Sequence, residues 1–131
     1  MQDDLGVVRK FFEAYQAVWL ATRDGKQIAR FYHAPCLSLR ADGTFVRFNT
    51  ADELAQFFQS TADAYYRQGW EQFALKDLSV QSLGSRSIFT TMTWQALKAD
   101  GALAKKWTQS YNLCLFDKEW AIVLSTFHVI D

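Results

Sequence analysis

Residues 50–83 read TADELAQFFQSTADAYYRQGWEQFALKDLSVQSL, and the spacing of the apolar residues changes within this stretch. Thr50 and Glu53 have the spacing of a capping box, in which each side chain accepts a hydrogen bond from a free backbone amide. The positions that follow at helical intervals are Leu54, Phe57 or Phe58, Thr61 and Tyr65. Gly69 ends this pattern, and from Phe73 onward alternate residues are apolar, which is typical of a strand. The stretch therefore predicts a capped helix followed by a strand.

The residues before this stretch predict two further helices and a hairpin. A stripe with spacings of three and four predicts an amphipathic N-terminal helix, and its members are Leu5, Val8, Phe12, Tyr15 and Trp19. Asp24-Gly25 should end that helix, because glycine is free to adopt the left-handed cap conformation. Residues 26–32 predict a short second helix that Pro35 prevents from continuing. Residues 36–48 are expected to form a hairpin with Asp42-Gly43 as its turn.

The second half of the chain predicts an antiparallel meander. Four segments with a period of two, residues 73–83, 87–97, 104–116 and 120–130, are separated by short turn signals at 84–85, 100–101 and 117–118. Short turns join antiparallel neighbours. Three helices followed by such a meander predict an α+β domain with the helices on one face of the sheet.

The composition narrows the classes of partner. The chain has 131 residues, 14 Lys and Arg, 14 Asp and Glu, and a formal net charge of zero. A neutral chain with scattered cations has no electrostatic footprint for nucleic acid or for an anionic membrane, so we expect neither partner. The longest early apolar run, AVWLA, is too short for a signal core or a membrane span, which favours the cytoplasm. The two cysteines, Cys36 and Cys114, are expected to be reduced and buried there.

The order of these elements resembles the nuclear transport factor 2-like superfamily, and within it the SnoaL-like branch. The resemblance rests on the helix broken at "DG", the short helix ending in "FY", the hairpin, the capped helix and the long strands ending in EWAIVLSTFHVID. It implies one domain over residues 1–131 with a cystatin-like, cone-shaped α+β barrel. In such a cone the N-terminal helices pack on the concave face of a curved, mixed but mostly antiparallel sheet. Members include ketosteroid isomerase, scytalone dehydratase, polyketide cyclases and many binding or dimerisation modules, so the fold alone does not define a function.

The resemblance also allows the catalytic positions to be tested. Ketosteroid isomerase-like members carry a general-base aspartate early in the first strand, and Arg40 stands at that position here. Their oxyanion-hole carboxylic acid corresponds to Asn112, which can donate a hydrogen bond but cannot titrate. Their oxyanion tyrosine corresponds to Gln16, with Tyr15 adjacent. Proton abstraction needs a base within reach of the substrate, so the sequence argues against isomerase chemistry of that type.

Scytalone dehydratase-like and cyclase-like members use histidine with aspartate, and the candidates here are His33, in the segment FYHAPC three residues before Cys36, and His128. His33 either contributes to a site or simply bonds the last carbonyls of the preceding helix. His128 is either a pocket wall residue or part of a subunit interface, because period-two alternation does not say which face is inside. His-x-x-Cys supplies two ligands where a closed zinc site needs four, so no metal site and no cofactor are predicted. A nucleophilic Cys36 is equally disfavoured, and the segment is interpreted as a helix-to-strand corner at the pocket mouth.

The segments 87–97 and 104–116 suggest a partly polar pocket. If Asn112 faces inward, Ser110, Cys114 and Phe116 share its face, and Tyr111, Leu113 and Leu115 lie outside. Trp94 is the preferred stacking residue. Such a wall suits a small apolar or mixed-polarity ligand, while an ordinary core with bonded hydroxyls is the competing interpretation. The predicted ligand-binding residues are Arg40, Trp94, Asn112, His33, Cys36 and His128.

Two functions remain open from the sequence. The first is a small-molecule-binding protein, with weak lyase or isomerase activity as an open possibility and no recognisable catalytic base. The second is a non-catalytic interaction module that forms a homodimer through the outer face of the sheet, because apolar residues occupy both faces of the last strands. An internal cavity that is empty and larger than about 300 Å³ would favour the ligand, and a cavity filled by side chains would favour the module.

Overall fold

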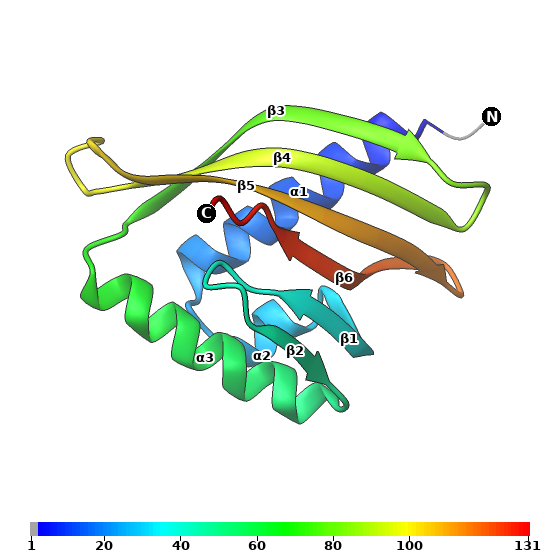
Figure 1. Ribbon diagram of the computed structural model, residues 1–131, viewed down its shortest axis with the longest axis horizontal. Helices are drawn as coiled ribbons and strands as arrows, with labels where there is room; N and C mark the ends of the chain where they lie inside the picture. Colours follow the sequence, from blue (N-terminus) through cyan, green and yellow to red (C-terminus); the bar gives the residue numbers. More distant parts are fainter. Residues whose placement is uncertain (1–2) are drawn as a thin grey trace.

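In the computed structural model, which describes residues 3–131, three helices pack on one face of a six-stranded sheet (Figure 1). The helices are α1 (Asp4–Ala21), α2 (Gly25–Ala29) and α3 (Ala51–Arg67). The strands are β1 (Tyr32–Leu39), β2 (Phe45–Phe48), β3 (Gln72–Ser82), β4 (Ser87–Leu97), β5 (Leu103–Phe116) and β6 (Glu119–Phe127). Their order is β2-β1-β6-β5-β4-β3, with only β1 and β6 parallel among the neighbours. The α+β class and the mixed, mostly antiparallel sheet are confirmed.

The prediction that Gly25 caps the first helix is wrong. The helix ends at Ala21, and Arg23 has the positive φ of 49° in the connection. Gly25 instead opens α2, where the side chain of Asp24 accepts a hydrogen bond from the Lys26 amide. A Cβ atom on Gly25 would lie 2.2 Å from the carbonyl oxygen of Ala55. Glycine is therefore required here for the close approach of α2 to α3, not for a turn.

The second helix is also shorter than its pattern suggested. It ends at Ala29, and Tyr32 already pairs with Ile122 of β6. Pairing with β6 draws the chain into the sheet before the helical pattern has run out. The turn of the predicted hairpin lies where expected, with Gly43 at a φ of 86°.

The structure confirms the capped helix. The Thr50 hydroxyl accepts a hydrogen bond from the Glu53 amide at 3.1 Å. The Glu53 carboxylate accepts from the amide of Asn49 at 2.8 Å, one residue before the expected donor. Gly69 follows the helix with a φ of 80°, which closes its last turn. Capping and termination of α3 are thus local features, and both follow from the sequence.

Strand β3 contains a bulge that changes which side chains face the helices. Its register with β4 shifts between Lys76 and Ser79, and Asp77 has a φ of 54°. In a regular strand, Leu75 and Leu78 would point to opposite faces, because they are three residues apart. The extra residue of a bulge restores them to the same side, where both pack against the core.

The core lies between α1 and the inner face of the sheet and is unusually aromatic. The ring of Phe12 in α1 lies 4.8 Å from Tyr111, 5.8 Å from Tyr15 and 6.3 Å from Trp94, measured between centroids. Leu5, the first member of the predicted stripe, remains 44% exposed. The inner face of the sheet and the middle of α1 therefore enclose a space bounded mainly by rings.

Candidate functional site

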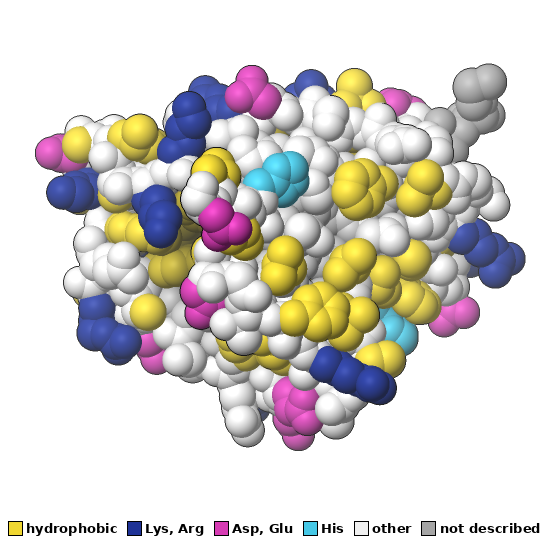
Figure 2. Space-filling model, viewed as in Figure 1, with side chains coloured by type: hydrophobic (Ala, Val, Ile, Leu, Met, Phe, Trp, Pro, Cys, Tyr) yellow, Lys and Arg dark blue, Asp and Glu magenta, His cyan; other side chains and the backbone are white. Residues whose placement is uncertain are grey.

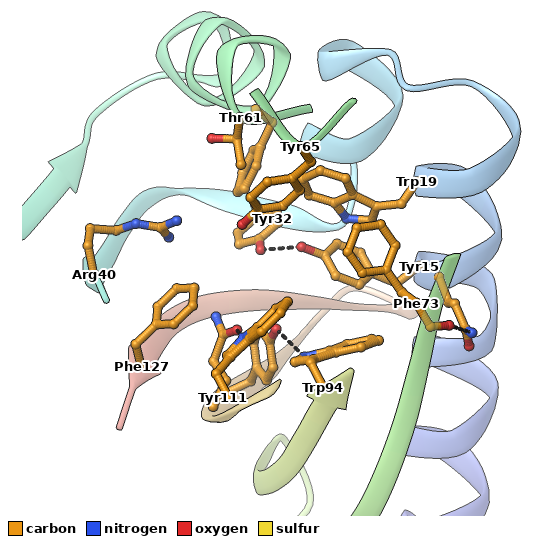
Figure 3. Close-up of a pocket in the computed structure, with 14 residues that line it drawn as sticks. Tyr15, Trp19, Tyr32, Arg40, Thr61, Tyr65, Phe73, Trp94, Tyr111 and Phe127 are labelled. Carbon is orange, nitrogen blue, oxygen red and sulfur yellow. Dashed lines mark hydrogen bonds between the residues drawn. The ribbon is translucent and has the colours of Figure 1, made fainter. Parts of the chain in front are cut away.

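A narrow pocket of about 40 Å³ lies in this aromatic space, between α1, α3 and the inner face of the sheet (Figure 3). Ten of its fourteen lining residues are aromatic. The other four are Gln16, Arg40, Thr61 and Gln109. Figure 3 shows Arg40 and Phe127 at one end of the pocket and Phe73 at the other. Rings nearly fill this pocket, and the remaining volume would hold only one or two water molecules.

The tyrosines in the pocket form hydrogen bonds that leave protons free to donate. The hydroxyls of Tyr15 and Tyr32 lie 2.6 Å apart, so one donates to the other and the second keeps its proton. The indole of Trp94 donates to the Tyr111 hydroxyl at 3.0 Å, and that hydroxyl keeps its own proton. The pocket thus offers two phenolic donors to an acceptor group on a ligand.

Burial keeps these phenols protonated. It raises the pKa of Tyr15 to about 12 and raises the pKa values of Tyr32 and Tyr111 well above their ordinary value. The cause is removal from water, which disfavours the phenolate. The pKa of Tyr65 is raised for the same reason. At neutral pH these groups act as hydrogen-bond donors and not as bases.

Among the described residues that line the pocket, Arg40 is the one with a charged side chain. Its guanidinium lies 4.7 Å from the ring centres of both Phe57 and Phe127, and it donates to the Ser38 hydroxyl at 3.1 Å. Among residues 3–131, the one side-chain ion pair joins Arg23 and Glu71. The Arg40 charge therefore remains available to an anion in the pocket.

The pocket is formed by the opposite face of β5 from the one predicted. Tyr111 and Leu113 are buried inside, at 2% and 0% exposure. Asn112 points to the outer face, where its amide donates to the Ser87 hydroxyl and to the carbonyls of Ile88 and Leu113. The prediction that Asn112 lines the pocket is wrong. The large rings fill the cone, so the odd-numbered positions of β5 turn inward.

Some of the remaining predicted residues line the pocket and others lie outside it. Trp94 and Arg40 line the pocket, as predicted. His33 lies in β1 beyond the end of α2, so it does not cap that helix, and its ring stacks on Phe116 at 3.7 Å between centroids. His128 is exposed and bonds the Ser110 hydroxyl at 2.8 Å, so the pocket-wall alternative for it is wrong.

Cys36 belongs to the core and not to the lining of the pocket. Burial raises the pKa of its thiol to about 11, so the thiol is protonated at neutral pH. This environment agrees with a structural role for the segment FYHAPC. Whether any of the six predicted residues binds a ligand stays a prediction.

The sequence reasoning missed three tyrosines of the pocket, Tyr15, Tyr32 and Tyr111. Tyr15 belongs to the inner stripe of the first helix, and its position in that stripe was the sequence signal that it faces the interior. Tyr111 shares its strand face with Trp107, and two large rings on one face of a strand are typical of a buried face. Gln109, between them, is fully engaged: it accepts from the Trp107 indole at 3.0 Å and donates to Ser125 at 2.6 Å.

The sequence matches one known protein family over nearly all of its length. Residues 3–129 match the family described as NTF2-like protein (DUF6841), and the chain belongs to that family. No curated protein matches the sequence. The SnoaL-like branch, which is a finer assignment, stays a prediction.

Solved structures show the same fold at low identity. The yeast UBP3-associated protein BRE5 is 18% identical, with a TM-score of 0.77 over 100% of this chain and 99% of that one. Aln2 from a Streptomyces species is 13% identical, with a TM-score of 0.77 over 97% and 91%. An NTF-2 like protein of unknown function from Shewanella oneidensis is 10% identical, with a TM-score of 0.73 over 95% and 98%. These likenesses establish the NTF2-like cone and no shared function.

Within residues 3–131, no group of three or more His, Cys, Asp or Glu side chains is placed to hold a metal ion. No helix in the same range has the length and the apolar character needed to cross a membrane.

Proposed function

We propose that this protein binds a small, flat, mostly apolar molecule that carries an anionic group. The observation that carries the proposal is the combination, in one pocket, of ten aromatic side chains with the unpaired guanidinium of Arg40. Rings supply apolar and stacking contacts. The guanidinium supplies a charge-assisted hydrogen bond to a carboxylate, and the phenols of Tyr111 and of the Tyr15–Tyr32 pair supply donors to a second acceptor. The sequence favours the cytoplasm as the compartment in which the protein binds this ligand.

The small volume constrains how such a ligand binds. Drug-sized ligands typically occupy pockets of about 300–1,000 Å³, far above the 40 Å³ found here, so cavity volume alone favours the interaction module and the ligand proposal rests on the chemistry of the lining. A ligand must therefore displace rings, and the half-buried rings of the lining are those of Trp19, Tyr32, Tyr65, Phe73 and Trp107. Because Trp107 is among them, binding should change tryptophan fluorescence.

The same pocket favours binding over chemistry. Within residues 3–131, no His, Asp or Glu side chain lines it. Its tyrosines are held protonated by burial, as described above. A lyase or isomerase step would need a base within reach of the substrate. We therefore assign binding as the main activity and leave weak lyase or isomerase activity as a subordinate alternative.

The test compares 4-methylbenzoate with 4-methylbenzamide, which has nearly the same shape and no charge. We expect the benzoate to bind and the Arg40→Gln variant to bind it roughly 10- to 100-fold more weakly, since a hydrogen bond to a charged group contributes about 1.5–3 kcal/mol. The benzamide should be unaffected by that change. Arg47→Gln is the matched control, because Arg47 is exposed on β2. Calorimetry and tryptophan fluorescence measure both ligands; equal affinities of wild type and Arg40→Gln for the benzoate would refute the role of Arg40.

A second candidate function, homodimerisation, is favoured by an apolar patch on the outer face of the sheet. The patch consists of Leu37, Leu39, Phe45, Phe116 and Leu124. Figure 2 shows apolar side chains gathered on this face, where β1, β2 and β6 lie. Leu37 and Phe45 are 37% and 63% exposed. The outer positions of β5 are more polar than expected, so we place the proposed dimer contact over β1, β2 and β6.

Sedimentation tests this second candidate. We expect a dimer at micromolar concentration and a monomer of 15.1 kDa for the Phe45→Asp variant. Leu20→Asp is the control, because Leu20 is 40% exposed on α1, away from the patch. A wild-type monomer that persists on tenfold concentration would exclude the dimer.

A further inference from the structure

A second cavity, an open groove of about 310 Å³, lies between α1 and the edge strand β3. Phe12 and Gln16 of α1 and Leu75 and Leu78 of β3 line it, together with the exposed Arg9 and Glu13. Polar atoms supply somewhat more of the groove surface than apolar atoms do: Arg9 and Glu13 form its helical border, and Leu75 and Leu78 supply apolar surface on the side of the strand. The groove is much larger than the aromatic pocket described above.

The fold builds this groove through the bulge in β3. The bulge at Asp77 places both Leu75 and Leu78 on the side of α1. Hydrogen bonds join the helix to the strand on both sides of the groove: the Gln16 amide donates to the Phe73 carbonyl, and the Ser82 hydroxyl donates to Asp4. Between these two attachments the helix and the strand leave the groove open.

Gln16 lines both the groove and the aromatic pocket. Phe12, the other residue at the boundary, faces the groove, while its ring contacts Tyr15, Trp94 and Tyr111 of the pocket. The partition between the two cavities is thus one side chain thick. The Gln16 side chain is half-buried and bonded to an edge-strand carbonyl, so water can replace that bond when the side chain turns away.

We propose that the pocket and the groove are two halves of one binding site, and that Gln16 is the residue that separates them. The ligand class is an aromatic acid with an aliphatic tail: the carboxylate meets Arg40, the ring lies among the aromatic side chains, and the tail passes Gln16 into the groove. This inference rests on the proposed function, and it adds the direction and the chemistry of the tail. The groove supplies volume for the tail, while the ring of the ligand still has to displace aromatic side chains of the pocket.

The experiment uses a series of 4-alkylbenzoates (methyl, butyl, hexyl and octyl) with the full chain. We expect the affinity of the wild type to rise about fourfold for each methylene group that enters the groove, because burial of one methylene group contributes a binding free energy of that size. Gln16→Ala should tighten octylbenzoate further and leave methylbenzoate nearly unchanged. Gln16→Phe, which fills the passage with a ring, should remove the gain from the longer tails.

A second variant tests the groove itself. Leu78→Ser should weaken octylbenzoate at least tenfold and methylbenzoate less than twofold, because only the long tail reaches Leu78. Leu83→Ser is the matched control, since Leu83 is 44% exposed just beyond β3 and outside the groove. Thermal melts establish that each variant is folded; if Leu78→Ser does not fold, Gln16→Phe decides alone.

The outcomes separate the inference from the proposed function. If methylbenzoate binds through Arg40 but affinity does not depend on tail length, or if Gln16→Phe leaves the tail-length dependence intact, the tail lies elsewhere and the inference is overturned. If none of the benzoates binds and Arg40→Gln changes nothing, the proposed function fails and the inference fails with it. A gain with tail length that is lost in Gln16→Phe supports both.

Discussion

Substituting Gly25 by alanine should destabilise the protein strongly, although alanine is the better helix former. The added Cβ would lie 2.2 Å from the Ala55 carbonyl oxygen, 2.6 Å from the Gln59 amide nitrogen and 2.8 Å from the Gln59 Cβ. Two of these atoms are backbone, so no side-chain rotation relieves the clash. Helices α2 and α3 must separate by roughly 1 Å to reach ordinary contact distances.

That separation has two costs. Overpacking of this kind costs about 1–3 kcal/mol. The Gly25 amide also donates to the Gln59 side chain at 2.9 Å, and loss of such a bond costs about 0.5–1.5 kcal/mol. Together we expect a loss of about 2–4 kcal/mol in the free energy of unfolding, which for a chain of this length lowers Tm by roughly 8–15 °C.

Urea denaturation and thermal melts measure this change. Gly6→Ala is the control, because its Cβ would meet only the end of the flexible Asp3 side chain, at 2.5 Å from the carboxylate oxygen. We expect the control to change the free energy of unfolding by less than about 1 kcal/mol. A Gly25→Ala variant as stable as the wild type would refute the conclusion that α2 and α3 are held in rigid backbone contact.

Three further predictions follow from the same structure. The free energy of unfolding should be unaffected by these tyrosines below about pH 10, the ordinary tyrosine pKa. Above that pH it should fall by up to about 5 kcal/mol per pH unit toward pH 12, because the unfolded chain loses up to four protons that the folded chain retains. The residues concerned are Tyr15, Tyr32, Tyr65 and Tyr111. Urea denaturation at pH 8, 10 and 11 checks this, and a flat profile contradicts it. Thr50→Ala should cost about 1 kcal/mol through loss of the cap on α3, whereas Ser60→Ala, at an exposed position of the same helix, should be neutral in the same assay. Tyr111→Phe should cost about 1–3 kcal/mol, because the buried Trp94 indole loses its acceptor; an unchanged midpoint in urea would show that the indole finds another partner.

The candidate site was only partly predictable, and the errors share one cause. Arg40 and Trp94 do line the pocket. Trp94 was named as a large stacking residue, and Arg40 was named because the family resemblance aligns it with a general-base position. Asn112 was placed on the wrong face, because alternation along β5 defines two sets of residues without saying which set is buried. The bulge at Asp77 had a signal in the sequence: the apolar positions of β3 change from odd, at Leu75, to even, at Leu78.

Structural features that depend only on residues close together in the sequence could be predicted from the sequence alone. The cap at Thr50, the end of α3 at Gly69 and the change to strand spacing at Phe73 are local, and each rests on hydrogen bonds or side-chain periodicity within a few residues. Features that depend on packing between distant segments could not. Gly25 resembles a helix terminator until Ala55 lies against it, and the face of β5 that becomes the pocket is chosen by the rings that α1 brings to it. The pocket exists because the buried rings of Tyr15, Tyr32 and Tyr111, which come from three separate elements, meet in the folded chain.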